Sequence, residues 1–253
     1  MNGEDTGKSA GGAPEEAVAA TARGHASRSI ARMAEPVKLT TQQLDERRLI
    51  HRGESARVQS DAFREIRTRL LALGGEHNFI TLVTSVSPGS GGSFVARNLA
   101  AAFAFDEAKT ALLIDCNPRD ASQYKALGTD AGPGLIDYLD HPAMGMEPII
   151  HRTGVPRLRL IPCGTARETG TEYFSSFRMR AALDSLRCRY PDRYLFLDGP
   201  AVKGAPDARI LSDLADFVVL VAGSGRDTPA AIAQAAATFD PGRFAGVVFD
   251  ALP

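Results

Sequence analysis

A glycine-rich segment from Ser85 to Ser93 is the part of the sequence best suited to bind an anion. It joins a short β-branched run to an alanine-rich segment that is typical of a helix. A turn of this kind presents several backbone N–H groups to a phosphate, and the helix dipole adds to the attraction. The alternative is a plain tight connection between a strand and a helix. We expect a phosphate-binding loop made of Gly89, Ser90, Gly91, Gly92 and Ser93.

Two aspartates that end predicted strands could complete such a site. Asp115 closes the apolar run 110–115, and Asp198 closes the run 194–198. Ligands of open α/β sheets bind beyond the carboxyl ends of the strands, so we expect both carboxylates near the loop. Ser93 stands where phosphate-binding loops keep the hydroxyl that holds magnesium. The three side chains would suit a magnesium–phosphate complex with two candidate catalytic aspartates, although such aspartates can also be simple helix caps.

The elements that must position these residues alternate between strand and helix. Several strands are continuously apolar, which is typical of a parallel sheet covered on both faces. We therefore predict an α/β fold, a doubly wound and mostly parallel sheet like that of P-loop NTPases. Strands are expected at 79–85, 110–115, 158–162, 194–198, 217–221 and 246–249, and helices at 61–73, 93–105, 177–189 and 228–238, with a further helix start at 134–139.

The first quarter of the chain differs from the rest in composition. All 12 Phe and 5 Tyr residues lie at or after Phe63, so the preceding residues cannot easily form a core. We predict a disordered tail over residues 1–40. Residues 41–60 are predicted to be a docking arm, because the apolar residues of segment 44–50 return after one helical turn around a charged cluster; its own domain is one candidate for the surface on which it docks. Residues 61–253 are expected to form the single α/β domain.

Composition argues against several classes of function. The 29 Lys and Arg residues nearly balance 30 Asp and Glu, so no basic surface for nucleic acid is expected. Three cysteines without a paired motif and five scattered histidines indicate neither a disulfide framework nor a zinc site. No apolar run approaches the ~20 residues of a membrane span, and no secretory signal is recognisable. We expect a cytoplasmic protein, which could reach the inner face of a membrane only through a partner.

These motifs, in this order, resemble the cytoplasmic domain of bacterial tyrosine autokinases (BY-kinases) of capsule and exopolysaccharide synthesis. The family is a branch of the P-loop ATPases with a deviant Walker motif, and the resemblance covers residues 44–249. Residues 84–93 match its Walker A motif, 111–119 its Walker A′ motif and 195–200 its Walker B motif. The resemblance implies a Mg-ATP site that phosphorylates protein tyrosines.

The resemblance also implies two kinds of protein contact. Asp61, Arg64 and Arg67 are similar to the Glu-x-x-Arg-x-x-Arg helix through which the family self-associates, so a homo-oligomer is expected. Arg64, Arg67 and the arm around residues 44–50 would also dock on a membrane polysaccharide co-polymerase, the chain-length regulator. The alternative for the two arginines is a solvated helix face.

The departures from the family pattern bear directly on catalysis. Gly92 occupies the position of the Walker A lysine, and Ser90 replaces the glutamate of that motif. Loss of this charge should cost at least ~3–4 kcal/mol of transition-state stabilisation. Binding of Mg-ATP or Mg-ADP is therefore expected to be weakened or lost. Further departures are Asn117, Ala201, and five tyrosines that do not cluster before the chain ends at Pro253, where the family has a tyrosine-rich tail.

We therefore predict a pseudokinase that acts as a scaffold or regulator, with weak or no turnover. The alternative is an active tyrosine autokinase or ATPase in which Arg97 or Lys203 replaces the missing lysine. A partitioning or cell-positioning ATPase of the same fold is less consistent with the sequence, because that class depends on the same lysine.

Overall fold

The computed structural model describes residues 38–251 except 76, 131, 169 and 205, so nearly all of the predicted tail lies outside the described residues. Its centre is a seven-stranded sheet in the order β3-β4-β2-β5-β1-β6-β7. All neighbouring strands are parallel except the short pair β3 and β4. The strands are β1 (Ile80–Ser85), β2 (Thr110–Asp115), β3 (His151–Arg152), β4 (Leu158–Ile161), β5 (Arg193–Asp198), β6 (Phe217–Gly223) and β7 (Phe244–Asp250).

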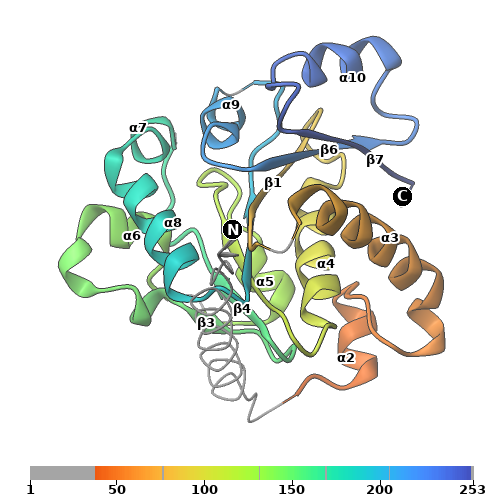
Figure 1. Ribbon diagram of the computed structural model, residues 1–253, viewed down its shortest axis with the longest axis horizontal. Coiled ribbons are helices and arrows are strands. Elements are labelled where there is room, and N and C mark those ends of the chain that lie inside the picture. The colour runs from red at the N-terminus through yellow and green to blue at the C-terminus, as the bar shows by residue number, and fades with distance from the viewer. Residues whose placement is uncertain (1–37, 76, 131, 169, 205, 252–253) are drawn as a thin grey trace, which may run out of the picture.

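Helices cover both faces of the sheet, as the continuously apolar strands predict (Figure 1). Helices α6, α8, α9 and α10 pack on one face, and α3, α4 and the arm pack on the other. Every residue of β1, β2, β4 and β5 is buried. The helices are α2 (Thr41–Glu46), α3 (Arg57–Gly74), α4 (Gly92–Ala104), α5 (Gln123–Leu127), α6 (Leu135–Asp140), α7 (Thr171–Phe174), α8 (Phe177–Arg189), α9 (Asp207–Ser212) and α10 (Pro229–Ala236), with single 3-10 turns at Glu54–Ala56, Pro142–Met144 and Glu147–Ile149.

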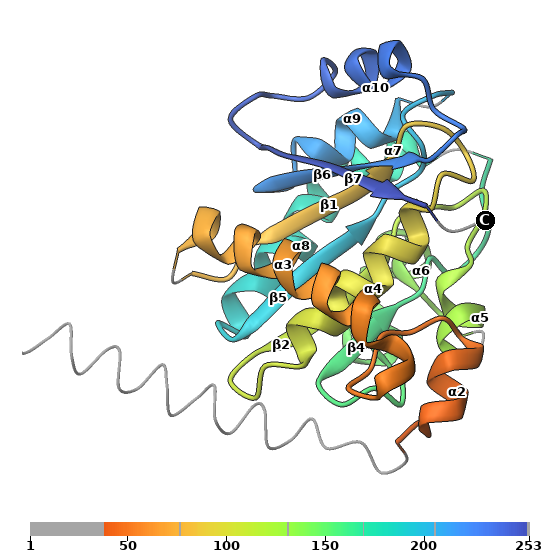
Figure 2. The ribbon, with the colours of Figure 1, turned by 90° about the vertical axis from the view of Figure 1, so that its right-hand side faces the viewer.

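The chain changes direction across the sheet beside β1. It runs from β1 outward to β2 and β4, returns to β5 between β2 and β1, and then adds β6 and β7 on the other side. Figure 2 shows β6 and β7 with α10 beyond them. Ligand sites of open α/β sheets lie at such a reversal, beyond the carboxyl ends of the strands. The topology therefore brings the ends of β1, β2 and β5 to one place.

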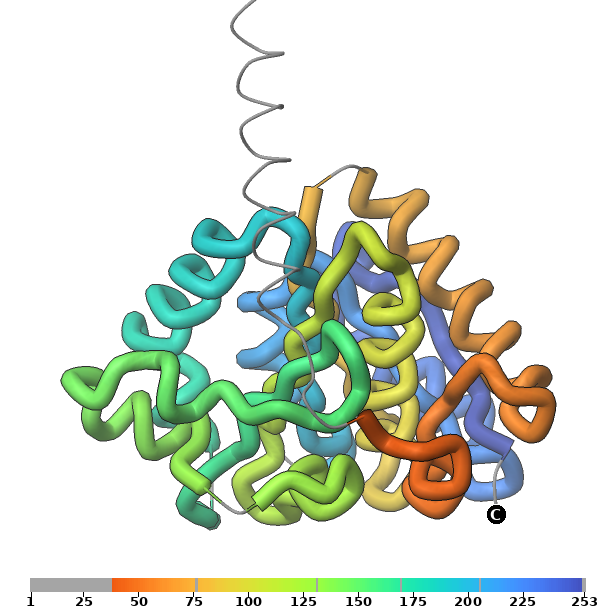
Figure 3. Tube along the Cα trace, turned by 90° about the horizontal axis from the view of Figure 1, so that it is seen from below, coloured from red at the N-terminus to blue at the C-terminus, as the bar shows by residue number. Residues whose placement is uncertain are grey.

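The arm packs on its own domain, beside α4 (Figure 3). Helix α2 begins with a capping box in which Thr40 and Gln43 exchange hydrogen bonds, which satisfies N–H groups at the helix start. Leu49 and Ile50 are then buried against the helical layer. Asn98 of α4 fixes this contact, because its Oδ1 accepts from the Ile50 N–H at 2.8 Å. Residues 49 and 50 are thus part of the core of the domain.

The observed elements differ from the prediction mainly at boundaries and in short elements. Helix α3 begins at Arg57, four residues before the expected start. Strand β3 and the helices α5, α7 and α9 were not predicted, because elements of two to six residues cannot show a full apolar period. Among the described residues no helix is both long and apolar enough to cross a bilayer.

Candidate functional site

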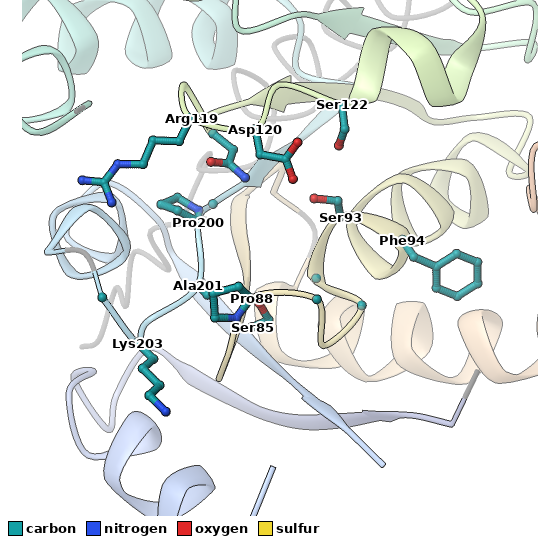
Figure 4. A pocket seen from close by; sticks show the side chains of 16 residues that line it. Ser85, Pro88, Ser93, Phe94, Arg119, Asp120, Ser122, Pro200, Ala201 and Lys203 are labelled. Carbon is teal, nitrogen blue, oxygen red and sulfur yellow. The ribbon is translucent and has the colours of Figure 1, made fainter. Parts of the chain in front are cut away.

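The predicted phosphate loop links β1 to α4 and borders a cavity of about 570 Å³. Gly89 and Gly91 have φ angles of 78° and 89°, which L side chains rarely adopt. Gly91 is also the N-cap of α4, so the turn leads straight into the helix N-terminus. Figure 4 shows the loop on one side of the cavity, with Asp120 and Ser122 from the segment after β2 on the other side, and with Ala201 from the segment after β5 beside Pro88. The five predicted loop residues are therefore brought together, with all but Ser90 at the cavity surface.

The two predicted aspartates are neighbours across adjacent strands. Asp115 at the end of β2 pairs in register with Asp198 at the end of β5. Both are almost fully buried, with 0% and 1% of their surface exposed. The Ser93 hydroxyl donates to Asp198 Oδ1 at 3.1 Å, so the loop and the carboxylates form one cluster.

Burial dominates the electrostatics of this carboxylate pair. Burial raises the pKa of Asp115 to about 8, and the negative charge of Asp198 acts in the same direction. Burial raises the pKa of Asp198 to about 6, although hydrogen bonds from Gln123 and Ser93 and the charge of Arg97 oppose the rise. Two carboxylates with raised pKa values are short of positive charge, which is the condition that a bound cation relieves.

Gln123 joins all three motifs and was not predicted from the sequence. Its side chain is fully buried, and its Nε2 donates to Asp198 Oδ2 at 2.6 Å and to the Ser93 carbonyl at 2.9 Å. Its backbone N–H donates to Asp115 Oδ2 at 3.3 Å. Gln123 is the first residue of the five-residue helix α5, so no periodic pattern marks it in the sequence.

The residues of this cluster fit a magnesium ion. Ser93, Asp115 and Asp198 offer only oxygen ligands, which Mg²⁺ prefers. The Gln123 Oε1 atom is buried and finds no hydrogen-bond donor among the described residues. Within the described part of the chain no three His, Cys, Asp or Glu side chains are grouped closely enough to hold a metal by themselves. A magnesium ion here would also need water or phosphate oxygens, as is usual for Mg²⁺ in phosphate-binding sites.

No lysine extends from Gly92, and the two cations considered as replacements lie differently. Arg97 lies one helical turn further along, with its guanidinium carbon 5.3 Å from the centre of the Phe94 ring, and its charge acts on the carboxylates of Asp198 and Asp250. Lys203 borders the cavity but extends away from Ser93 (Figure 4). Arg119 also extends away, and its Nε donates to the carbonyl of Glu168. A side chain at position 92 would have its Cβ 3.2 Å from that of Ser85.

An unpredicted arginine contacts the outside of the loop. Arg226, after β6, donates from Nη1 to the Pro88 carbonyl at 3.3 Å and lies 2.7 Å from where a Cβ at Gly89 would be. The Asp250 carboxylate, at the end of β7, occupies the space that a Cβ at Gly91 would need. The sequence could not reveal these contacts, since each joins residues more than a hundred positions apart.

The residues predicted for self-association have different surroundings. Asp61 and Arg64 form an exposed ion pair of 2.7 Å on α3. Arg67, one turn further, is partly buried and donates to the Ala102 carbonyl of α4 at 2.9 Å. Asp61 and Arg64 thus remain at the surface, whereas Arg67 binds its own domain. Contact of these residues with a second copy of the chain is still a prediction.

The parallel sheet, the glycine loop between β1 and α4, and the aspartates at β2 and β5 define a P-loop NTPase-like domain. A scan against models of known protein families finds no match. The chain is 31% identical over 174 residues to the tyrosine-protein kinase CpsD of Streptococcus agalactiae, covering 68% of this chain and 72% of CpsD. It is 30% identical over 182 residues to YwqD of Bacillus subtilis, covering 72% and 75%. The chain belongs to the bacterial tyrosine-protein kinases.

Other similarities agree with this assignment. The putative tyrosine-protein kinase EpsB of Ralstonia solanacearum is 33% identical over 195 residues, which are 76% of this chain and only 26% of EpsB. The chain thus spans about a quarter of EpsB. The BceF tyrosine kinase domain matches with a TM-score of 0.65 at 26% identity, covering 77% of this chain and 78% of BceF. The Escherichia coli ETK kinase domain has the same fold, with a TM-score of 0.70 at 23% identity over 85% and 88% of the two chains.

Proposed function

We propose that this chain is a kinase-like cytoplasmic partner of a membrane polysaccharide co-polymerase in capsule or exopolysaccharide synthesis. It acts as a scaffold or regulator and transfers phosphate slowly or not at all. The observation that carries the proposal is Gly92, which replaces the lysine of the family motif in a loop that keeps its glycines and Ser93. The family relationship supports the first part, and the missing charge supports the second.

The charges around the loop explain why the lysine matters. Asp115 and Asp198 are buried beneath the loop, and the Asp250 carboxylate packs against Gly91. A bound triphosphate would add several negative charges next to these carboxylates. Phosphoryl transfer depends almost wholly on charge stabilisation, so loss of the lysine should cost at least ~3–4 kcal/mol of transition-state energy. Backbone N–H groups can still bind a phosphate, so weakened Mg-ADP or Mg-ATP binding is compatible with the proposal.

Helix α3 offers the surface for the proposed protein contacts. Its Asp61–Arg64 pair is exposed, and Val58 on the same helix exposes 84% of its surface. In contrast, Leu49 and Ile50 of the arm are buried in the domain. We therefore assign docking on the co-polymerase, and possible homo-oligomer contacts, to the outer face of α3. The chain would then act at the inner face of the membrane through its partner.

A second candidate function is an active tyrosine autokinase in which another cation replaces the lysine. Arg226 favours it, because its guanidinium already lies against the loop at Pro88 and Gly89. In this case Asp115 and Asp198 would hold magnesium and activate the acceptor hydroxyl. Removal of the compensating cation, by Arg226→Ala, Arg97→Ala or Lys203→Ala, would then abolish turnover.

ATP turnover of three proteins tests the proposal. The wild type should turn over far below the roughly 1–100 s⁻¹ of kinases, and Gly92→Lys should be at least tenfold faster. Gly92→Ala is the matched control, because its Cβ makes the same 3.2 Å approach to Ser85 without adding charge. A gain in Gly92→Lys but not in Gly92→Ala supports the proposal. Ordinary kinase turnover by the wild type contradicts it.

A further inference from the structure

We propose that Gln123 is a positioning residue for a divalent cation at the carboxylate pair. Its amide holds the carboxylate of Asp198 and the backbone of Ser93 in a fixed relation to each other. The inference uses the magnesium site that the family relationship suggests, but it does not depend on whether the chain transfers phosphate. It adds a residue to the site that neither the motifs nor their spacing indicate.

The orientation of the Gln123 amide follows from its partners. Nε2 contacts two acceptors, a carboxylate oxygen of Asp198 at 2.6 Å and the Ser93 carbonyl at 2.9 Å. An amide oxygen in that place would face two acceptors without a proton between them. The nitrogen therefore faces Asp198 and Ser93, and Oε1 is left without a hydrogen-bond donor among the described residues.

The two oxygens of Asp198 are held by different donors. Ser93 Oγ donates to Oδ1 at 3.1 Å, and Gln123 Nε2 donates to Oδ2 at 2.6 Å. Hydrogen bonds to a charged group are about twice as strong as neutral ones, so together they fix the plane of the carboxylate. Partners that orient metal ligands in this way typically contribute about 10–100-fold to metal affinity.

The Gln123 Oε1 atom is buried and has no hydrogen-bond donor among the described residues, which is a second observation in favour of this role. A buried acceptor without a donor costs about 1–3 kcal/mol, and folded proteins rarely retain one without a reason. A cation at the carboxylates would bring water molecules whose O–H groups are strong donors. Such a water molecule would supply the donor that Oε1 lacks among the described residues.

Mn²⁺ binding measured by electron paramagnetic resonance of the free ion tests the role of Gln123. The wild type is expected to bind Mn²⁺, and Gln123→Leu should bind it about 10–100-fold more weakly. Gln59→Leu is the matched control, since Gln59 is exposed on α3 and should leave the affinity unchanged. Unchanged or tighter binding by Gln123→Leu, or no binding by the wild type at millimolar Mn²⁺, overturns the proposal.

A second variant separates positioning from general stability. Gln123→Asn keeps the amide but shortens the side chain by one methylene, so it should fold yet fail to reach Asp198. We expect weakened Mn²⁺ affinity in the folded variant, at concentrations of urea well below its unfolding transition. Lower stability with unchanged affinity would make Gln123 only a structural residue and contradict the proposal. None of these results depends on ATP turnover, so the functional proposal can fail separately.

Discussion

Asp115 and Asp198 have neighbouring buried carboxylates whose negative charge the fold balances only in part, through hydrogen bonds to Asp198 and the charge of Arg97. Burial raises the pKa of Asp115 from 3.8 to about 8, so the folded chain holds a proton there that the unfolded chain releases. A group whose pKa is higher in the folded than in the unfolded protein contributes its full stabilisation at pH values below its pKa in the unfolded protein. That contribution is lost as the pH rises through its pKa in the folded protein. The window of loss for this pair is therefore about pH 4 to 8.

Asp115→Asn should remove much of this pH dependence. The free energy of unfolding of the variant, relative to wild type, should rise between pH 5 and pH 8. The expected slope is at most about 1.4 kcal/mol per pH unit, the limit for one proton. Urea denaturation of both proteins at several pH values measures the difference. A difference that does not change with pH contradicts the assignment, and the exposed Asp61→Asn serves as the control.

Single substitutions can also test whether the Asp250 carboxylate packs closely against the loop at Gly91. Gly91→Ala must adopt a φ of 89° and displace the Asp250 carboxylate, so it should lose more stability than strain alone explains. Gly225→Ala is the matched control, because Gly225 has a φ of 71° and nothing within 4 Å of its Cβ position. We expect about 1 kcal/mol of destabilisation for Gly225→Ala and clearly more for Gly91→Ala. Equal losses would show that Asp250 does not crowd the loop.

Helix α4 is held at its C-terminal end by three arginines from separate segments. Arg52 donates to the Phe105 carbonyl, Arg67 to Ala102 and Arg157 to Ala104, at 2.9 to 3.0 Å. Positive charge at a helix C-terminus complements the helix dipole and satisfies the last carbonyls. The three arginines therefore anchor the helix whose other end forms the phosphate loop.

Arg64 and Arg67, one helical turn apart on α3, should respond differently to mutation. Arg67→Ala removes a partly buried charged hydrogen bond and should destabilise the fold by about 1–3 kcal/mol. Arg64→Ala removes an exposed ion pair and should change stability by less than about 1 kcal/mol. If the family's self-association applies, sedimentation should show a smaller species for Arg64→Ala. Similar stability losses for both variants would contradict the separate roles.

Asn98 of α4 holds the arm against this helix through hydrogen bonds. Its fully buried amide accepts from the Ile50 N–H at 2.8 Å and donates to the carbonyls of Arg48 and Phe94 at 3.0 Å. We expect Asn98→Ala to release the arm and to speed amide hydrogen exchange at residues 48–51 by at least tenfold, with less change in β1 and β2. Uniform acceleration across the domain would instead indicate loss of global stability.

For the whole molecule, the sequence predicts those parts of the fold that short-range residue patterns mark. Buried strands such as β2 and β5 are continuous apolar runs, and the loop before Ser93 is marked by its glycines. The signal of each lies within about ten residues. The fold class, the candidate site and the pairing of Asp115 with Asp198 follow from such signals and from the rule that ligands bind at strand ends.

The side-chain contacts of Gln123, Arg226 and Arg67 that were not predicted join distant parts of the chain. Gln123 reaches Asp198 across 75 positions, and Arg226 reaches Pro88 across 138. Arg67 carries a family motif, yet its contact with Ala102 depends on how α3 packs on α4. Periodicity and motif spacing describe neighbours along the chain, so tertiary contacts of single polar residues escape them.

We expect that Gly92 leaves the domain without an effective nucleotide site. Calorimetric titration of Mg-ATP into the wild type and into Gly92→Lys measures this. The wild type should bind with a Kd of about 1 mM or weaker, and Gly92→Lys should bind at least tenfold more tightly, a gain of about 1.4 kcal/mol. Micromolar binding by the wild type that the added lysine does not change would show that the loop needs no lysine.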